Sequence, residues 1–158
     1  RPMGRTARGV RGMMLEGSDQ IIGMEVVSDA TASTLVSVTE TGYGKRTSLK
    51  EYRVQSRGGK GIITIKTGGR NGQVVDVKLV ENDSELMFIT DRGKVQRTRV
   101  KALSIIGRNN MGVRRMVLEA DERIVAVAKL AEKEDDEGNP EIEATAPDGG
   151  APAPGEGA

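Results

Sequence analysis

The stretch Thr-Glu-Thr-Gly at residues 39–42 recurs as Thr-Asp-Arg-Gly at residues 90–93, 51 positions further along the chain. The residues that follow also repeat, because Lys-Arg-Thr at 45–47 returns as Gln-Arg-Thr at 96–98, again after 51 positions. A Thr-x-x-Gly sequence between apolar runs indicates a hairpin turn. A repeat of about 50 residues is typical of propellers and solenoids, so the chain is predicted to consist of repeated supersecondary units.

Each unit is predicted to contain four short β-strands. In one of them Val75, Val77 and Leu79 point to one face while the residues between them point to the other, which is the period of a strand. The predicted strands are, in chain order, residues 13–15, 20–27, 34–39, 44–47, 62–65, 73–80, 85–90, 94–98, 116–118 and 123–130.

Four antiparallel strands in about 50 residues predict a propeller blade. We therefore expect an all-β fold of β-propeller or β-pinwheel blades, about two and a half of them, over residues 1–130. A closed ring needs about four or more blades, so either earlier blades precede this chain or the fold is an open array. The N-terminus has neither an initiator Met nor an apolar signal segment, and this favours a chain cut from a larger protein.

The composition excludes several classes of function. The chain has no cysteine and no histidine, so it lacks thiolate ligands, disulfides and the commonest general base and nitrogen ligand. We therefore expect no catalytic residues, no metal and no cofactor in this chain. Its apolar runs are far shorter than the roughly 20 residues that a membrane helix needs, which predicts a cytoplasmic protein.

The charge is divided sharply along the chain. Residues 1–130 hold 23 Lys and Arg against 14 Asp and Glu, a net charge of +9, whereas residues 131–158 hold one Lys and nine acids, a net charge of −8. The acidic segment has almost no large apolar residues, so it is predicted to be a disordered tail. The basic body is predicted to bind a polyanion.

Three glycine-rich basic turns align in the repeats. They are Arg-Gly-Val-Arg-Gly at 8–12, Arg-Gly-Gly-Lys-Gly at 57–61 and the stretch from 108 to 115, which holds three arginines. Glycine lets the backbone approach a phosphate closely, and Arg and Lys supply the charge. One such turn in every blade predicts a row of phosphate contacts along a rim, with little base readout.

These residues also resemble a known family. Residues 55–61, Gln-Ser-Arg-Gly-Gly-Lys-Gly, resemble the gyrase-A box, Gln-Arg-Arg-Gly-Gly-Lys-Gly, and differ only at Ser56. Residues 5–12 and 41–47 resemble gyrase A blades too. The resemblance implies the last blades of a six-bladed C-terminal β-pinwheel that wraps duplex DNA, followed by an acidic tail. The family's defining box lies in its first blade, so the box at 55–61 looks like one of the later copies.

The resemblance implies a non-catalytic DNA-wrapping module within an ATP-dependent type II topoisomerase. The partners it implies are duplex DNA, the other gyrase A domains and gyrase B in an A2B2 assembly, associated with the bacterial nucleoid. Lys45, Arg46 and Arg97 lie near predicted fourth strands, where a charge could equally protect a strand edge. The residues predicted to contact DNA are Arg8, Arg11, Lys45, Arg46, Gln55, Arg57, Gly58, Gly59, Lys60, Gly61, Arg97, Arg108, Arg114 and Arg115.

Two other functions fit the same patterns. The C-terminal domain of topoisomerase IV uses similar blades, although the box and the acidic tail favour gyrase. A propeller can also serve only to bind proteins, because one fold hosts many functions. The position of the charges distinguishes these functions, since a DNA-wrapping domain carries its basic residues on the outer rim and an interaction propeller usually binds through a face.

Overall fold

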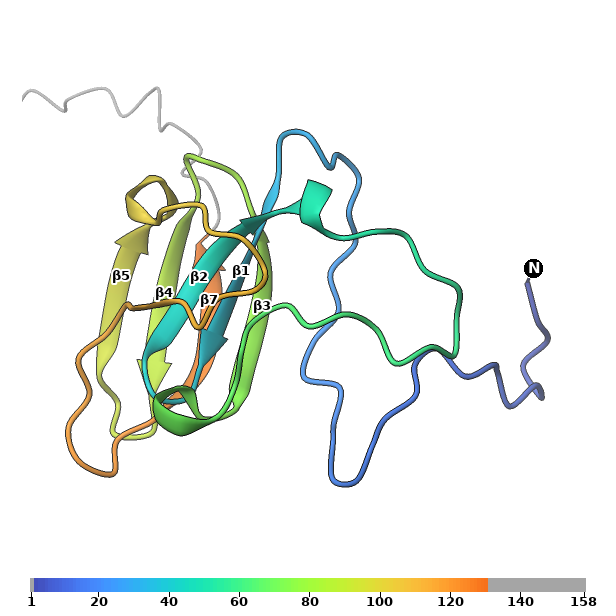
Figure 1. Ribbon diagram of the computed structural model, residues 1–158, viewed down its shortest axis with the longest axis horizontal. Helices are drawn as coiled ribbons and strands as arrows, with labels where there is room; N and C mark the ends of the chain where they lie inside the picture. Colours follow the sequence, from blue (N-terminus) through green and yellow to red (C-terminus); the bar gives the residue numbers. More distant parts are fainter. Residues whose placement is uncertain (1, 131–158) are drawn as a thin grey trace, which may run out of the picture.

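The computed structural model describes residues 2–130, and in this part of the chain the regular structure is all β apart from three single-turn 3₁₀ helices (Figure 1). The predicted tail, residues 131–158, lies outside the described residues. The strands are β1 (Thr34–Thr39), β2 (Tyr43–Ser48), β3 (Val74–Val80), β4 (Glu85–Thr90), β5 (Val95–Arg99), β6 (Val113–Arg114) and β7 (Ile124–Leu130). The helices are η1 (Leu49–Glu51), η2 (Gly69–Asn71) and η3 (Val100–Ala102).

The strands form two antiparallel sheets that share one core. The first sheet has the order β3-β1-β2-β6 and the second has the order β5-β4-β7. Both β-hairpins, β1-β2 and β4-β5, turn at the repeated Thr-x-x-Gly sequence, as predicted. The buried core is aliphatic apart from one Phe and consists of Val36, Val38, Val80, Leu86, Phe88, Val100, Leu103, Met116, Ile124 and Val127.

The sheets exchange strands between repeats. The hairpin β1-β2 pairs on one side with β3 from the second repeat and on the other side with β6 from the third. The hairpin β4-β5 from the second repeat pairs with β7 from the third. The predicted β-propeller class is confirmed, but its blades are not made of four consecutive strands. A sequence period shows that units recur, whereas pairing between units is decided by how they stack in space.

The acidic residue of the repeated turn joins each hairpin to the strand that arrives from the next repeat. Glu40 Oε1 accepts a hydrogen bond of 2.9 Å from the Gln73 N–H, just before β3. Asp91 Oδ1 accepts the equivalent bond of 3.0 Å from the Arg123 N–H, just before β7. An acid therefore occupies this position in both copies of the tetrapeptide for a reason visible in the structure: it holds the exchanged strand in register.

The first repeat forms no regular strand before β1 within the described residues. Residues 13–15 and 20–27 were predicted as strands, but only Met13 makes an isolated bridge, to Gly59. Residues 62–65 and 116–118 are also irregular. β3 and β7 each pair with the hairpin of the repeat before them, whereas residues 20–27 pair with no strand in the described chain. Their side chains Ile21, Met24 and Val26 are 69%, 86% and 76% exposed.

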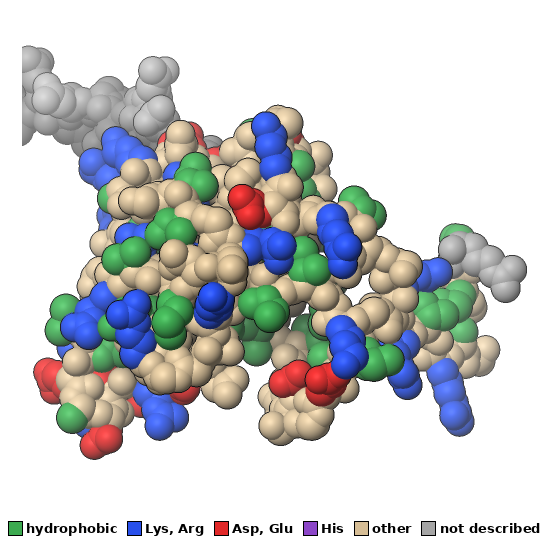
Figure 2. Space-filling model, viewed as in Figure 1, with side chains coloured by type: hydrophobic (Ala, Val, Ile, Leu, Met, Phe, Trp, Pro, Cys, Tyr) green, Lys and Arg blue, Asp and Glu red, His purple; other side chains and the backbone are tan. Residues whose placement is uncertain are grey.

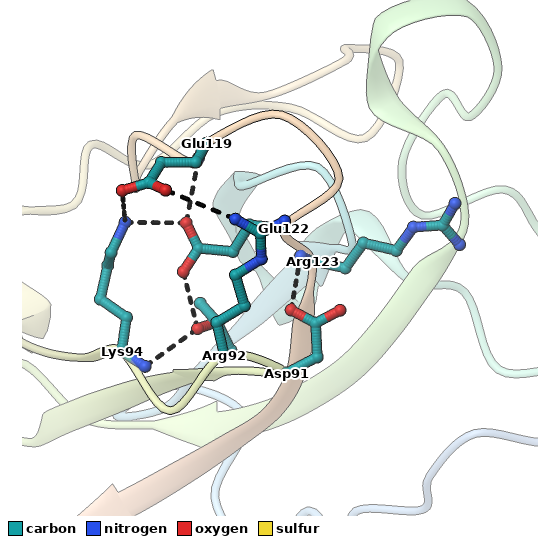
Figure 3. A network of polar contacts seen from close by, with 7 residues as sticks. Asp91, Arg92, Lys94, Glu119, Glu122 and Arg123 are labelled. Atoms are coloured by element: carbon teal, nitrogen blue, oxygen red, sulfur yellow. Dashed lines mark hydrogen bonds and ion pairs between the residues drawn. The ribbon is translucent and has the colours of Figure 1, made fainter.

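A buried carboxylate fixes the second turn to the loop before β7 (Figure 3). Glu122 Oε1 accepts 2.8 Å from the Thr90 hydroxyl, and Oε2 accepts 2.7 Å from Lys94 Nζ and 3.0 Å from the Glu119 N–H. The side chain of Glu122 is only 1% exposed. Its hydrogen bond with Lys94, followed by those with the Glu119 amide and Thr90, lowers its pKa to about 2.

The network predicts an acid-sensitive contribution to stability. The pKa of Glu122 is lower in the folded chain than its usual 4.5, so the stabilisation is present above that pH and is lost as the pH falls toward 2. We expect Glu122→Gln to lower the free energy of unfolding at pH 7. The difference in unfolding free energy between this variant and the unsubstituted chain should become smaller below pH 4.5. Urea unfolding at several pH values measures this. Glu119→Gln, at a 69% exposed carboxylate, is the control and should change stability little. A loss of unfolding free energy for Glu122→Gln that stays the same at every pH would contradict the expectation.

Candidate nucleic-acid interface

The three basic turns, here called turn A (residues 8–12), turn B (residues 57–61) and turn C (residues 108–115), lie in series. The Gly58 N–H donates to the Gly12 carbonyl at 2.8 Å, and the Met14 N–H donates to the Gly59 carbonyl at 2.9 Å. These bonds join turn A to turn B, and the two loops run side by side at the end of the molecule away from the sheets (Figure 1). The stacking of the turns, which the repeat suggested, is thus a direct backbone contact.

Turn C is connected to the segment that follows turn B. The Lys66 N–H donates to the Asn110 carbonyl at 3.1 Å, and Arg108 Nη1 donates to the Ile63 carbonyl at 2.8 Å. Gly112 allows turn C to lie against the first sheet, since its φ is +80° and a Cβ there would lie 2.7 Å from the Gly44 carbonyl oxygen. The three turns therefore form a row in which turn C is joined to residues 63 and 66 rather than to turn B itself.

Turns A and B expose their charges. Arg8, Arg11, Arg57 and Lys60 are all exposed, and Lys60 forms an ion pair with Glu16 on the neighbouring loop. Arg8, Arg11 and Arg57 have no acidic partner within residues 2–130. Figure 2 shows Lys and Arg side chains standing out from the arm that carries these turns and from the body beside it. Of the other predicted residues in turn B and just before it, Gln55 and Gly59 are exposed, and Gly58 and Gly61 are half-buried.

The structure corrects the expected place of Lys45 and Arg46. They are 1% and 4% exposed, because β6 and the loop before it cover β2 and make it an inner strand. Lys45 Nζ donates to the carbonyls of Gly107 at 2.7 Å and Arg108 at 2.5 Å, and Arg46 Nε donates to the Thr34 hydroxyl at 2.6 Å. Neither side chain lies on an accessible edge, so neither belongs to an exposed phosphate-binding surface.

The surroundings of Lys45 agree with this inward position. Burial lowers the pKa of Lys45, and the positive charge of Arg108 lowers it further, while Glu51 acts in the opposite direction. Burial also lowers the pKa of Arg46. Lys45 therefore holds the start of turn C in place by its hydrogen bonds to the backbone of Gly107 and Arg108.

The remaining predicted arginines differ in their exposure and in the groups that they contact. Arg97 is exposed but pairs with Glu85, and this hydrogen bond is the largest of the effects that lower the pKa of Glu85. Arg108 is half-buried, with its Cζ 6.0 Å from the centre of the Tyr52 ring. Arg115 is half-buried and donates to the Gly44 carbonyl at 3.3 Å, and burial lowers its pKa. Arg114 is exposed.

Sequence reasoning did not select Arg70. It is exposed at η2, and its guanidinium lies over the Tyr43 ring, 5.0 Å from the centroid. No sequence pattern indicated this, because Arg70 lies outside the aligned turns and 27 positions from Tyr43.

Residues 2–130 contain no candidate metal-binding cluster and no candidate membrane-spanning helix. No group of three or more carboxylate, Cys or His side chains in this range is placed to hold a metal ion. No helix in the same range is long and apolar enough to cross a membrane.

Comparison with known proteins identifies the family of this chain. The family model described as DNA gyrase C-terminal domain, beta-propeller, matches residues 1–28, 33–81 and 84–131. The gyrase A protein of Salmonella typhimurium is 43% identical over 137 residues, and that of Staphylococcus aureus is 41% identical over 145 residues. These alignments cover 87% and 92% of this chain, but only 15% and 16% of the relatives.

Solved structures show the same fold. A DNA gyrase A C-terminal domain matches with a TM-score of 0.59 and 30% identity, over 62% of this chain and 33% of that one. The C-terminal domain of a DNA topoisomerase IV matches with a TM-score of 0.71 over 77% of this chain and 38% of that one, and its 19% identity shows the fold alone. The family model covers all three repeats, each with its basic turn, and so this chain belongs to the family of DNA gyrase A C-terminal β-propeller domains.

Proposed function

We propose that this chain binds duplex DNA by its sugar-phosphate backbone, through the exposed cations of turns A and B, and does no chemistry itself. The observation that carries the proposal is the row of stacked turns in which Arg8, Arg11 and Arg57 are exposed without acidic partners in the described part of the chain. Such cations attract a polyanion strongly, because phosphate contacts release bound counterions.

The chemistry of the turns favours backbone contacts over base readout. Arg, Lys and Gly match phosphate oxygens, and these contacts carry no sequence information. Single-stranded DNA would call for exposed aromatic rings on which bases stack. The chain has only two Tyr and one Phe, of which Phe88 is fully buried. Duplex DNA is therefore the better ligand.

The role of the whole protein is part of the same proposal. As a piece of gyrase A, the chain would hold wrapped DNA while other domains cleave it and gyrase B hydrolyses ATP, in an A2B2 assembly that introduces negative supercoils in the bacterial cytoplasm. The relatives at 41–43% identity favour gyrase over topoisomerase IV. The exposed cations of turns A and B lie on loops beyond the sheets, which favours a DNA-binding rim over a protein-binding face.

The test substitutes two cations of turn B. We expect Arg57→Ala combined with Lys60→Ala to weaken duplex binding about tenfold at moderate salt, because both side chains are exposed. The loss should be equal on duplexes of unrelated sequence, measured by fluorescence anisotropy. Lys129→Ala, which removes an exposed charge on β7, is the control. Failure of the unsubstituted chain to bind duplex DNA, or a loss confined to one sequence, would refute the proposal.

A further inference from the structure

Two arginines from distant segments lie on one tyrosine ring. The Cζ atoms of Arg70 and Arg114 are 5.0 Å and 5.5 Å from the centre of the Tyr43 ring, and Arg114 Nη2 donates to the Tyr43 hydroxyl oxygen at 3.1 Å. The ring is nearly buried at 9% exposure, whereas both arginines are exposed. The three side chains contribute to the lining of an open pocket of about 390 Å³, to which turns A and B contribute no residue.

The backbone holds both guanidinium groups against the same strand. Arg114 is the register partner of Tyr43 where β6 pairs with β2. Arg70 belongs to η2, where the Thr41 hydroxyl lies 2.8 Å from the carbonyl oxygens of both Arg70 and Asn71 and shares its single proton between them. Both arginines therefore start from fixed backbone and are stacked on a fixed ring, so little freedom would be lost on binding a ligand.

The charges of Arg70 and Arg114 are not paired with an acid in the described part of the chain. Neither Arg70 nor Arg114 forms an ion pair within residues 2–130, and their Cζ atoms are at most 10.5 Å apart, the sum of their distances to the ring centre. Both guanidinium groups are therefore close enough to act on one phosphodiester backbone.

Three acids also line the pocket, and two of them form ion pairs. Glu122 pairs with Lys94, and Glu119 pairs with Arg92 (Figure 3). Arg123, the third lining cation, pairs with Glu40, and Asp121 is the one lining acid without a basic partner in the described range. The unpaired lining charges are therefore two positive and one negative. The excess of one positive charge favours binding of an anion, and the two planar guanidinium groups are the side chains that would hold it.

We infer that Arg70, Tyr43 and Arg114 form a second binding site for a phosphodiester of duplex DNA. Guanidinium groups match the paired oxygens of a phosphate and stack on aromatic faces, so one ring can align two of them toward one or two adjacent phosphates. Tyr43 positions the arginines and makes no base contact. This inference rests on the proposed function, and it adds a contact point on the first sheet to those of turns A and B.

The experiment compares variants in duplex binding over a range of salt. We expect Arg70→Ala and Arg114→Ala each to weaken binding about fivefold, and the double variant to reduce the slope of log K against log salt by about one or more. Asp121→Asn should act in the opposite direction and tighten binding about twofold, since it removes the unpaired acid. Asn tolerates the positive φ of 65° at this position, so the substitution should not disturb the loop.

The outcomes separate the two proposals. If the double Arg57→Ala, Lys60→Ala variant loses affinity but the Arg70 and Arg114 variants behave like Lys129→Ala, the pocket is not a DNA site and the proposed function stands. If Asp121→Asn weakens binding, the electrostatic account of the pocket is overturned. If the unsubstituted chain does not bind duplex DNA, both proposals fail together.

Discussion

Replacing Gly42 by Ala is expected to destabilise the chain by about 3 kcal/mol or more, through a left-handed backbone and a direct clash. The φ of Gly42 is +85°, and a Cβ at this position would lie 2.5 Å from the carbonyl oxygen of Met116. The Gly42 carbonyl also accepts bonds from the N–H groups of Arg115 and Met116, at 2.7 Å and 3.2 Å. The end of turn C therefore docks on this residue, and a methyl group would push it away and draw Met116 from the core.

The repeat supplies a matched control. Gly93 holds the same position in the second turn with a φ of +78°, but a Cβ there would meet nothing within 4 Å. Gly93→Ala should therefore lose only the conformational part, about 1–2 kcal/mol. Denaturant unfolding of the two variants measures the difference. Equal losses would show that the approach of turn C to Gly42 contributes nothing to stability.

Replacing Asn71 by Asp is expected to have an effect of similar size. Asn71 is fully buried, and its Nδ2 donates to the carbonyls of Lys66 at 2.7 Å and Met111 at 2.6 Å. A carboxylate would lose both bonds and face two carbonyl oxygens in a buried place, which costs about 3 kcal/mol or more. The bonds connect the segment after turn B with turn C, so the variant should also loosen the row of turns.

The pH dependence of this variant gives a second measurement. Burial beside carbonyl oxygens would raise the pKa of the new carboxyl, so its destabilising effect should shrink as the pH is lowered and the group becomes neutral. Asn109→Asp introduces the same charge at an exposed position of turn C and should change stability by about 0.5 kcal/mol or less. A loss for Asn71→Asp that matches this control would mean that Asn71 does not join the two segments.

These two residues have the same structural task as Lys45. The Gly42 carbonyl accepts a hydrogen bond from the Arg115 N–H at the end of turn C. Lys45 donates to the Arg108 carbonyl at the beginning of the turn, and Asn71 donates to the Met111 carbonyl in its middle. All three are buried, and all three act on the backbone of a basic loop that carries exposed charge at Arg114. Residues of β2, its hairpin turn and η2 thus set the position of side chains that would otherwise be free on a glycine-rich loop.

The local features of the fold follow from the sequence alone. Alternating apolar residues and Thr-x-x-Gly turns predicted residues 34–39 and 85–90 as strands, and these are the bounds of β1 and β4. The 51-residue repeat predicted the β-propeller class, and the glycine-rich basic turns, together with the box at residues 55–61, predicted the family. Such features depend on neighbouring residues, because backbone conformation, side-chain alternation and turn geometry are short-range properties.

Only the tertiary structure decided which strands pair and which charges are accessible. Alternation shows that Lys45 and its neighbours form a strand, but not whether another strand covers its edge, and β6 comes from almost 70 positions further along the chain. Residues 20–27 have the pattern of a strand and remain irregular, because a strand also needs a partner for its hydrogen bonds. The meeting of Arg70 and Arg114 on Tyr43 depends on the same exchange of strands. Sequence patterns specify local conformation, whereas edges, burial and pockets arise from contacts between distant segments.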